Sequence, residues 1–273
     1  MPSNWTQNDI KVNGVSLHYY RTGDSNGKPL VLAHGFSDDG RCWPLLARDL
    51  GNYDVVLPDA RGHGLSARVE RGQEIDGAAD LAGIIRGLGL ERPIVAGHSM
   101  GANTAALLGA RFPDLPRALI LEDPPWRMPG PAPAGPRESM EESPLGKWVR
   151  GLADLTLEQV IDQNRAEHPT WPEVILRRWC EAKKRLDLNF LAVQSEGQMD
   201  WQEVAKSIAC PTLLITAEPE KGGIVTPREA RMATEMNDHI VEAHIPGTGH
   251  HVRFENYDAY VDAVKRFLAK IDQ

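Results

Sequence analysis

The sequence is poor in cysteine and has no long apolar run, and each shortage excludes a class of protein. Cys42, Cys180 and Cys210 are odd in number, lie far apart and show no metal-ligand spacing. We therefore expect three free thiols, no structural disulfide and no metal site. No stretch approaches the roughly 18 apolar residues that a membrane-spanning helix needs, and residues 1–7 have neither the basic start nor the apolar core of a signal peptide. These absences predict a cytoplasmic protein without a membrane partner.

Basic residues are also fewer than acidic residues. The chain has 30 Lys and Arg against 38 Asp and Glu, a formal net charge of -8. Its densest basic stretch, residues 177–185, is interrupted by Trp179, Cys180 and Glu181, which favours the solvated face of a helix over a phosphate-binding patch. We therefore expect no nucleic-acid partner, and the sequence is compatible with a homodimer.

Short apolar strands alternate with helical stretches along the first half of the chain. A chain of 273 residues can bury one large core, so one domain with an insertion is expected. The alternation predicts an α/β fold, with a largely parallel sheet that helices cover on both faces. Asn13-Gly14 predicts a hairpin turn before it. The expected strands lie at residues 30–33, 55–57, 94–96 and 118–121, and the expected helices at 43–50, 75–88 and 102–111.

The alternation of strands and helices ends after residue 123. Residues 124–136 are rich in proline, which fits neither a helix interior nor a sheet. Helix-compatible stretches follow, and the strand pattern resumes at residues 212–216. We predict that residues 1–123 and 208–273 form the core and that residues 124–207 form a helical lid.

The motif Gly97-His98-Ser99-Met100-Gly101 is the strongest chemical signal. It follows an apolar β-run and precedes an Ala- and Leu-rich helical stretch, the context that a nucleophile elbow requires. The two glycines would let strand and helix pass closely, and the helix dipole would favour negative charge near Ser99. The alternative is an ordinary serine that caps the helix.

Three further motifs each follow an apolar strand. Together with the elbow, and in this order, they make the chain resemble the α/β-hydrolase superfamily, in particular its esterase- and lactonase-like members with a lid. The resemblance implies an eight-stranded, mostly parallel sheet and a lid inserted after strand 6. The motifs are His34-Gly35-Phe36, residues 59–66, and Gly247-Thr248-Gly249-His250. No Walker-type loop, metal-ligand cluster or dinucleotide fingerprint is present, so we expect no cofactor.

A serine nucleophile needs a base, an orienting acid and donors for the oxyanion. Among the nine histidines, His250 fits the superfamily's Gly-x-Gly-His pattern, and His251 is the alternative. The backbone N–H groups of Phe36 and Met100 are expected to form the oxyanion hole.

The acid is less well defined by the sequence. Counting from the strand at residues 212–216, Glu220 takes the position of the superfamily's usual aspartate. The loop that carries it is longer than in the superfamily's pattern. Glu218, nearer the strand end, is one alternative. Asp123 is the other, because some members take the acid from the strand that precedes the lid. We predict Glu220 and leave both alternatives open.

Five of the seven tryptophans fall in the lid segment, which favours an apolar pocket with rigid walls. We expect His34, Trp126, Trp148 and Trp179 to line it. The predicted function is a serine hydrolase for carboxylic esters or lactones of small to medium, largely apolar substrates. The alternatives are carbon–carbon bond hydrolysis, cyanohydrin cleavage or perhydrolysis by the same residues, or a small-molecule receptor with slow turnover.

Overall fold

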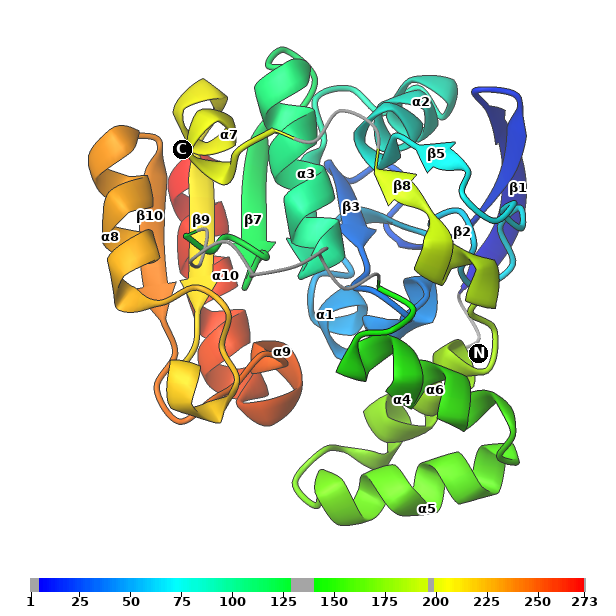
Figure 1. The fold of residues 1–273 in the computed structure, drawn as a ribbon. Helices are drawn as coiled ribbons and strands as arrows, with labels where there is room; N and C mark the ends of the chain where they lie inside the picture. Colours follow the sequence, from blue (N-terminus) through cyan, green and yellow to red (C-terminus); the bar gives the residue numbers. More distant parts are fainter. Residues whose placement is uncertain (1–4, 129–139, 196–198, 273) are drawn as a thin grey trace.

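The computed structural model describes residues 5–128, 140–195 and 199–272. An eight-stranded sheet runs through it in the order β1-β2-β4-β3-β6-β7-β9-β10 (Figure 1). Strand β2 pairs antiparallel with β1 and β4, and the other neighbours are parallel, so the predicted mostly parallel sheet is confirmed. The strands are β1 (Thr6–Val12), β2 (Val15–Gly23), β3 (Pro29–Ala33), β4 (Asp54–Pro58), β6 (Ile94–His98), β7 (Ala118–Glu122), β9 (Thr212–Thr216) and β10 (Ile240–His244).

The central strands are apolar on both faces because each face supports its own core. In β3, Val31 and Ala33 belong to one buried cluster, whereas Leu30 and Leu32 belong to another. Alternate residues of a strand point to opposite faces. Such a strand forms a continuous apolar run in the sequence, which is why these strands could be located there.

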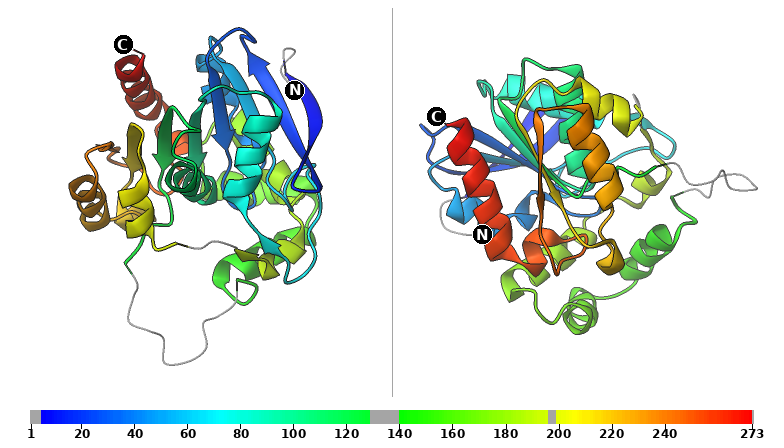
Figure 2. Two further views of the ribbon diagram at one scale, coloured as in Figure 1. Left: turned by 90° about the horizontal axis from the view of Figure 1, so that it is seen from above. Right: turned by 90° about the vertical axis from the view of Figure 1, so that its left-hand side faces the viewer.

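Helices cover both faces of the sheet, as predicted (Figure 2). The first cluster includes residues of α2, α3, α7 and α8, and the second includes residues of α1, α9 and α10. The helices are α1 (Pro44–Asp49), α2 (Gly77–Gly87), α3 (Met100–Arg111), α7 (Trp201–Ser207), α8 (Pro227–Met236), α9 (Val252–Glu255) and α10 (Tyr257–Ile271). Three 3₁₀ turns complete the connections: η1 (Gly40–Cys42), η2 (Leu188–Ala192) and η3 (Pro219–Lys221).

Helix α2 begins two residues later than the predicted helix at 75–88. Asp76 caps it by accepting a hydrogen bond from the Ala79 N–H, a strong start signal. The residues before the cap form β5 (Glu74–Ile75), which pairs in parallel with β8 (Gln194–Ser195) in a small second sheet.

The insertion between β7 and β9 follows the sixth strand of the main sheet. Its helices α4 (Pro144–Ala153), α5 (Leu157–Glu167) and α6 (Glu173–Lys183) form a lobe below the sheet in Figure 1. This lobe has its own apolar cluster. Helix α7 falls in the predicted lid range but packs on α3, in the main core.

The turn from β6 into α3 is strained, as the elbow motif predicts. Ser99 has φ 52° and ψ -116°, and its side chain makes no capping hydrogen bond, which argues against an ordinary helix cap. A Cβ on Gly97 would lie 2.3 Å from the Gly101 carbonyl oxygen, and one on Gly101 would lie 2.2 Å from the Ala33 carbonyl oxygen. The two glycines therefore make this turn possible.

We predict that Gly101→Ala lowers the free energy of unfolding by about 1–3 kcal/mol or prevents folding, because the new methyl group meets backbone atoms of β3. Gly151→Ala is the matched control. Gly151 is an exposed residue of α4, and a Cβ added there would meet nothing within 4 Å, so its replacement should stabilise by roughly 0.5–1 kcal/mol. Urea unfolding followed by circular dichroism measures both, and equal effects would contradict the account.

No helix in the described ranges is long and apolar enough to cross a membrane.

Candidate active site

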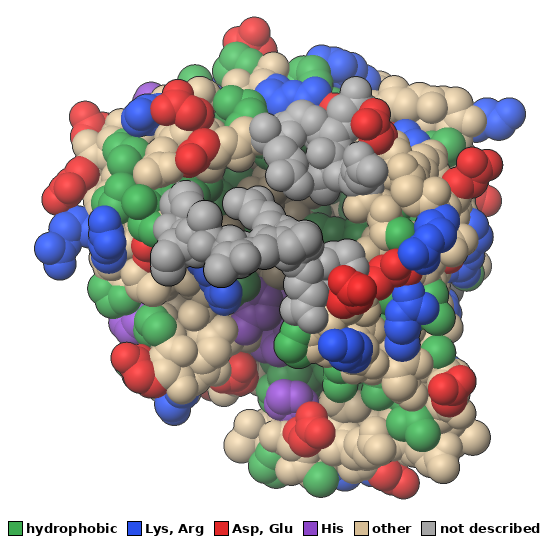
Figure 3. Space-filling view, viewed as in Figure 1, with side chains coloured by type: hydrophobic (Ala, Val, Ile, Leu, Met, Phe, Trp, Pro, Cys, Tyr) green, Lys and Arg blue, Asp and Glu red, His purple; other side chains and the backbone are tan. Residues whose placement is uncertain are grey.

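Ser99 and His250 line one cavity of about 280 Å³, together with Phe36. We call it the small cavity. Ser99 follows β6, Phe36 follows β3, and His250 lies beyond β10, so all three come from the carboxyl ends of strands, where open α/β sheets bind ligands. Residues of α4, α5 and α6 form the opposite wall. Histidine side chains are visible in the hollow between this lobe and the rest of the molecule (Figure 3).

His250 is paired with a buried carboxylate. Its Nδ1 lies 2.6 Å from Asp123 Oδ2. A carboxylate accepts, so Nδ1 carries a proton, and in the neutral form of the ring the lone pair is on Nε2. Asp123 also accepts from the N–H groups of Ile224 and Val225, at 2.8 to 3.0 Å. These bonds fix the carboxylate and offset the cost of burying its charge.

The acid predicted from the sequence, Glu220, is in the wrong place for this role. It is exposed on η3 and forms no hydrogen bond to His250. The physical reason is that Asp123, which directly follows the adjacent strand β7, already accepts the hydrogen bond from His250 Nδ1. The lengthened loop after β9 supplies backbone N–H donors to that carboxylate rather than an acid of its own. Asp123 was one of the two alternatives that the sequence left open.

The other alternative, Glu218, holds the histidine loop instead. Its Oε1 accepts from the Gly247 N–H at 2.8 Å. Glu255 Oε2 accepts from the Gly249 N–H at 2.6 Å. Two carboxylates therefore fix the loop on either side of Thr248, which limits the movement of the imidazole.

A second loop carries Phe36, one of the two expected oxyanion donors. The N–H of Ser37, which has φ 61°, donates to His63 Nε2 at 3.2 Å, and the Asp38 N–H donates to the Gly35 carbonyl at 3.1 Å. Burial holds the pKa of His63 well below its usual value, so the ring is neutral and can accept. The loop around Phe36 is thus fixed by its neighbours.

Neither expected oxyanion donor is already engaged in a hydrogen bond with a described residue. The amides of Phe36 and Met100 donate no hydrogen bond to another described residue. Met100 opens helix α3, whose first N–H groups have no partner inside the helix. Both amides are therefore free to bind a developing oxyanion.

The basic stretch 177–185 is a solvated face only in part: Arg177 and Lys184 are exposed, as expected, whereas Lys183 is buried. Lys183 is 6% exposed, and its Nζ lies 2.5 Å from Asp38 Oδ1. Arg185 pairs with the buried Asp39 at 2.8 Å. The lobe is thus joined by ion pairs to the loop that follows Phe36, a contact between distant segments that the sequence pattern does not reveal.

Two more buried charges continue this network. Arg253 donates from its backbone and its guanidinium to Glu122, at 3.0 and 3.1 Å. Its other terminal nitrogen lies 3.5 Å from Asp38 Oδ2. Each buried charge in the network has an opposite partner, as burial requires.

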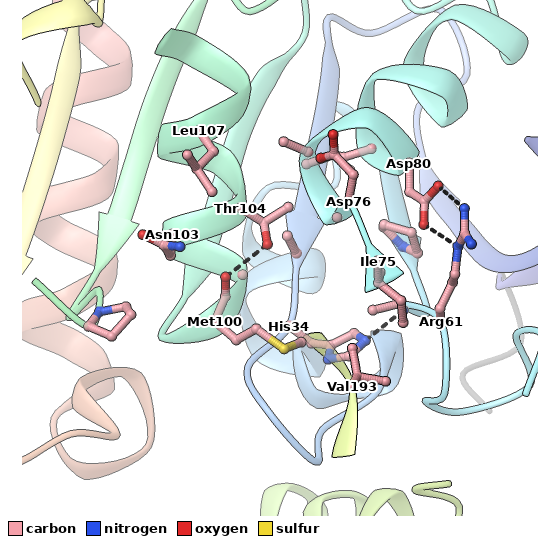
Figure 4. A pocket seen from close by; sticks show the side chains of 18 of the residues that line it. His34, Arg61, Ile75, Asp76, Asp80, Met100, Asn103, Thr104, Leu107 and Val193 are labelled. Carbon is pink, nitrogen blue, oxygen red and sulfur yellow. Dashed lines mark hydrogen bonds and ion pairs between the residues drawn. The ribbon is translucent and has the colours of Figure 1, made fainter. Parts of the chain in front are cut away.

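A second cavity, of about 490 Å³, lies beside α2 and α3, and we call it the large cavity (Figure 4). His34, Met100 and Thr104 line it together with apolar residues of α2 and α3. The ring of His34 is neutral, because burial lowers its pKa, and its Nε2 accepts from the Ala60 N–H at 3.0 Å.

The predicted pocket residues divide between the two cavities. Trp148 and Trp179 line the small cavity, and His34 lines the large one. Trp126 lines neither. It is fully buried and stacks on Trp201 with ring centroids 5.7 Å apart, so its assignment to the pocket was wrong. Its position after a buried strand fits a core residue better.

Within the ranges that the structure describes, no group of three or more His, Cys, Asp or Glu side chains could hold a metal ion.

Comparisons with known proteins agree with this fold. The model of the "Alpha/beta hydrolase family" matches residues 30–263. N-formylmaleamate deformylase of Pseudomonas putida is 28% identical over 270 residues, which cover 95% of each chain. The crystal structure of E-2-(acetamidomethylene)succinate hydrolase superposes with a TM-score of 0.79 at 21% identity, covering 97% of this chain and 99% of that one. The enol-lactonase of Burkholderia xenovorans gives a TM-score of 0.75 at 23% identity, over 96% and 100%.

The family match spans most of the chain and includes the segments that carry Ser99, Asp123 and His250. The chain therefore belongs to the alpha/beta hydrolase family.

Proposed function

We propose that this protein is a serine hydrolase that cleaves carboxylic esters or lactones through an acyl-enzyme. One observation carries the proposal. Ser99 stands on a strained elbow and lines the same cavity as His250, whose Nδ1 is held by the buried Asp123. Along the chain the nucleophile comes first, the acid second and the base last, which matches the family's order, with the acid taken from the end of the strand before the insertion.

In the first half of the reaction, the Ser99 hydroxyl oxygen attacks the substrate carbonyl carbon while His250 Nε2 takes its proton. The Asp123 carboxylate keeps the imidazole oriented and stabilises its positive charge. The carbonyl oxygen becomes negative and is bound by the Phe36 and Met100 amides. His250 then gives the proton to the leaving oxygen, and the ester bond breaks.

In the second half, a water molecule attacks the acyl carbonyl. His250 takes a proton from the water and returns it to the Ser99 oxygen as the acid leaves. The same two steps would hydrolyse an N-acyl bond if His250 protonates a leaving nitrogen. The similarity to the Pseudomonas putida deformylase, which spans nearly the whole chain, makes amide hydrolysis the second candidate.

The proposal is tested first with a series of p-nitrophenyl esters from acetyl to dodecanoyl. We expect multiple turnovers with the highest kcat/KM at short or medium chains, because the two cavities have volumes of about 280 and 490 Å³. Ser99→Ala should fold normally and lose nearly all turnover. Turnover that persists in this variant would refute Ser99 as the nucleophile, and turnover by neither protein would refute the esterase proposal.

The choice of acid is tested with Asp123→Asn and Glu220→Gln. Asp123→Asn should lower kcat by about 10⁴-fold, because an amide in this position favours the wrong tautomer of His250. Glu220→Gln should change kcat less than twofold, since Glu220 is exposed and makes no contact with the imidazole. Thermal unfolding of both variants serves as the control for folding. The reverse order of effects would assign the acid to Glu220.

A further inference from the structure

His98, the residue before the nucleophile, contacts two of the loops that the proposed reaction uses. It is the last residue of β6 and is 1% exposed. Its Nε2 lies 2.9 Å from the backbone carbonyl oxygen of His250. Its Nδ1 lies against the loop that carries Phe36, because a Cβ added to Gly35 would be only 2.6 Å from that nitrogen. His98 therefore joins the elbow, the histidine loop and the loop around Phe36 at one buried point.

The hydrogen bond to the carbonyl defines the tautomer of His98. A carbonyl can only accept, so Nε2 carries a proton. Nδ1 makes no hydrogen bond with a described residue and lies 4.0 Å from Asp38 Oδ2, which is beyond hydrogen-bond distance. Burial holds the pKa of His98 well below its usual value, so the ring is neutral and Nδ1 has no proton. The charge of Asp38 is balanced instead by Lys183 and Arg253.

This hydrogen bond holds a part of His250 that the other contacts leave free. The two carboxylates described above bind the loop before this residue, and Asp123 binds its ring. Among the described residues, only His98 donates to the carbonyl of His250 itself. Fixing both the backbone and the ring limits the positions that the base can take. A displacement of about 1 Å can slow a reaction about 10²-fold.

A neutral ring at position 98 is also compatible with the charge that forms during the reaction. The ring centroids of His98 and His250 lie 4.6 Å apart. The imidazole of His250 becomes positive when it takes the proton of Ser99. A second positive charge at this distance would destabilise that state, whereas the neutral ring of His98 does not.

From these contacts, we propose that His98 is a positioning residue for the reaction. Through its Nε2–H, it holds the backbone of His250 so that the imidazole meets the Ser99 hydroxyl. It acts through His250 and takes no part in proton transfer. This inference rests on the proposed function, because it assigns His98 a part in the same hydrolysis.

Two amide variants test the hydrogen bond with one chemical group at two lengths. The NH₂ of glutamine reaches about as far as Nε2 of histidine, whereas the NH₂ of asparagine reaches only as far as Nδ1. His98→Gln should therefore keep the donor to the His250 carbonyl and retain at least about a third of the wild-type kcat for a p-nitrophenyl ester. His98→Asn should lose the donor and lower kcat about 10- to 100-fold. Its KM should change less than about threefold, because the base moves and the binding surface does not. Thermal unfolding checks that both variants fold.

A second measurement separates positioning of His250 from distortion of the elbow. The rate at which a fluorophosphonate labels Ser99 is compared in the wild type, His98→Asn, His250→Ala and the double variant. His98→Asn should slow labelling about 10-fold or more in the wild-type background. It should change labelling less than about twofold in the His250→Ala background, since no imidazole remains there to be positioned. A distorted elbow would slow labelling by the same factor in both backgrounds.

The tautomer of His98 can be measured in the unaltered protein, which keeps the inference testable if His98→Asn does not fold. Nitrogen chemical shifts of the histidine rings, measured by NMR, distinguish the two neutral tautomers and the charged form. We expect His98, assigned from its backbone resonances, to be neutral and protonated on Nε2 at pH 7.

The outcomes separate this inference from the proposed function. Equal kcat in His98→Gln and His98→Asn, equal slowing of labelling in both backgrounds, or a His98 ring protonated on Nδ1 would overturn the positioning role while leaving the serine hydrolase intact. No turnover of any ester and no labelling of Ser99 in the folded wild type would contradict the proposed function and the inference with it.

Discussion

The close passage of helix α3 over strands β3 and β6 is the constraint on which the site depends. It is possible only because positions 97 and 101 are glycines, where a Cβ would lie 2.2 to 2.3 Å from backbone oxygens. The approach forces Ser99 into a positive φ, which costs of order 1–3 kcal/mol. The packing of the sheet and of helix α3 in the two buried clusters stabilises this strained conformation. The hydroxyl is consequently exposed to the cavity and not used to cap the helix.

Buried charges fix the loops around this elbow. Asp123 anchors the imidazole of His250, and it is itself held by three hydrogen bonds from two amides of the loop after β9. Asp38 joins Lys183 of the lobe to the loop that carries Phe36. Arg185 and Asp39 form a second ion pair between the lobe and this loop. The wall of the small cavity and the Phe36 amide are thus positioned together.

Much of this architecture could be predicted from the sequence, because it depends on local patterns. The strands are apolar runs, Asn13 and Gly14 both take the positive φ of the predicted hairpin turn, and helix α3 ends at residue 111, as predicted. The elbow was equally clear, since its glycines and serine are adjacent in the chain.

The remaining features depend on contacts between distant segments. Nothing near Asp123 shows that its carboxylate lies 2.6 Å from His250, 127 residues away, and counting along one loop favoured Glu220 instead. Likewise, the sequence favours a surface position for Lys183 until Asp38 is seen opposite it, and a pocket position for Trp126 until it is seen against Trp201. Such pairings are set by the sheet order, which a local pattern does not contain.

The most direct test of the account is covalent labelling with a fluorophosphonate, followed by peptide mass spectrometry. The account predicts one adduct on Ser99, formed rapidly in the wild type and at least about 10²-fold more slowly in His250→Ala, because the base is needed to activate the hydroxyl. Labelling at another residue, or an equal rate in His250→Ala, would contradict the assignment of Ser99 and His250 as nucleophile and base.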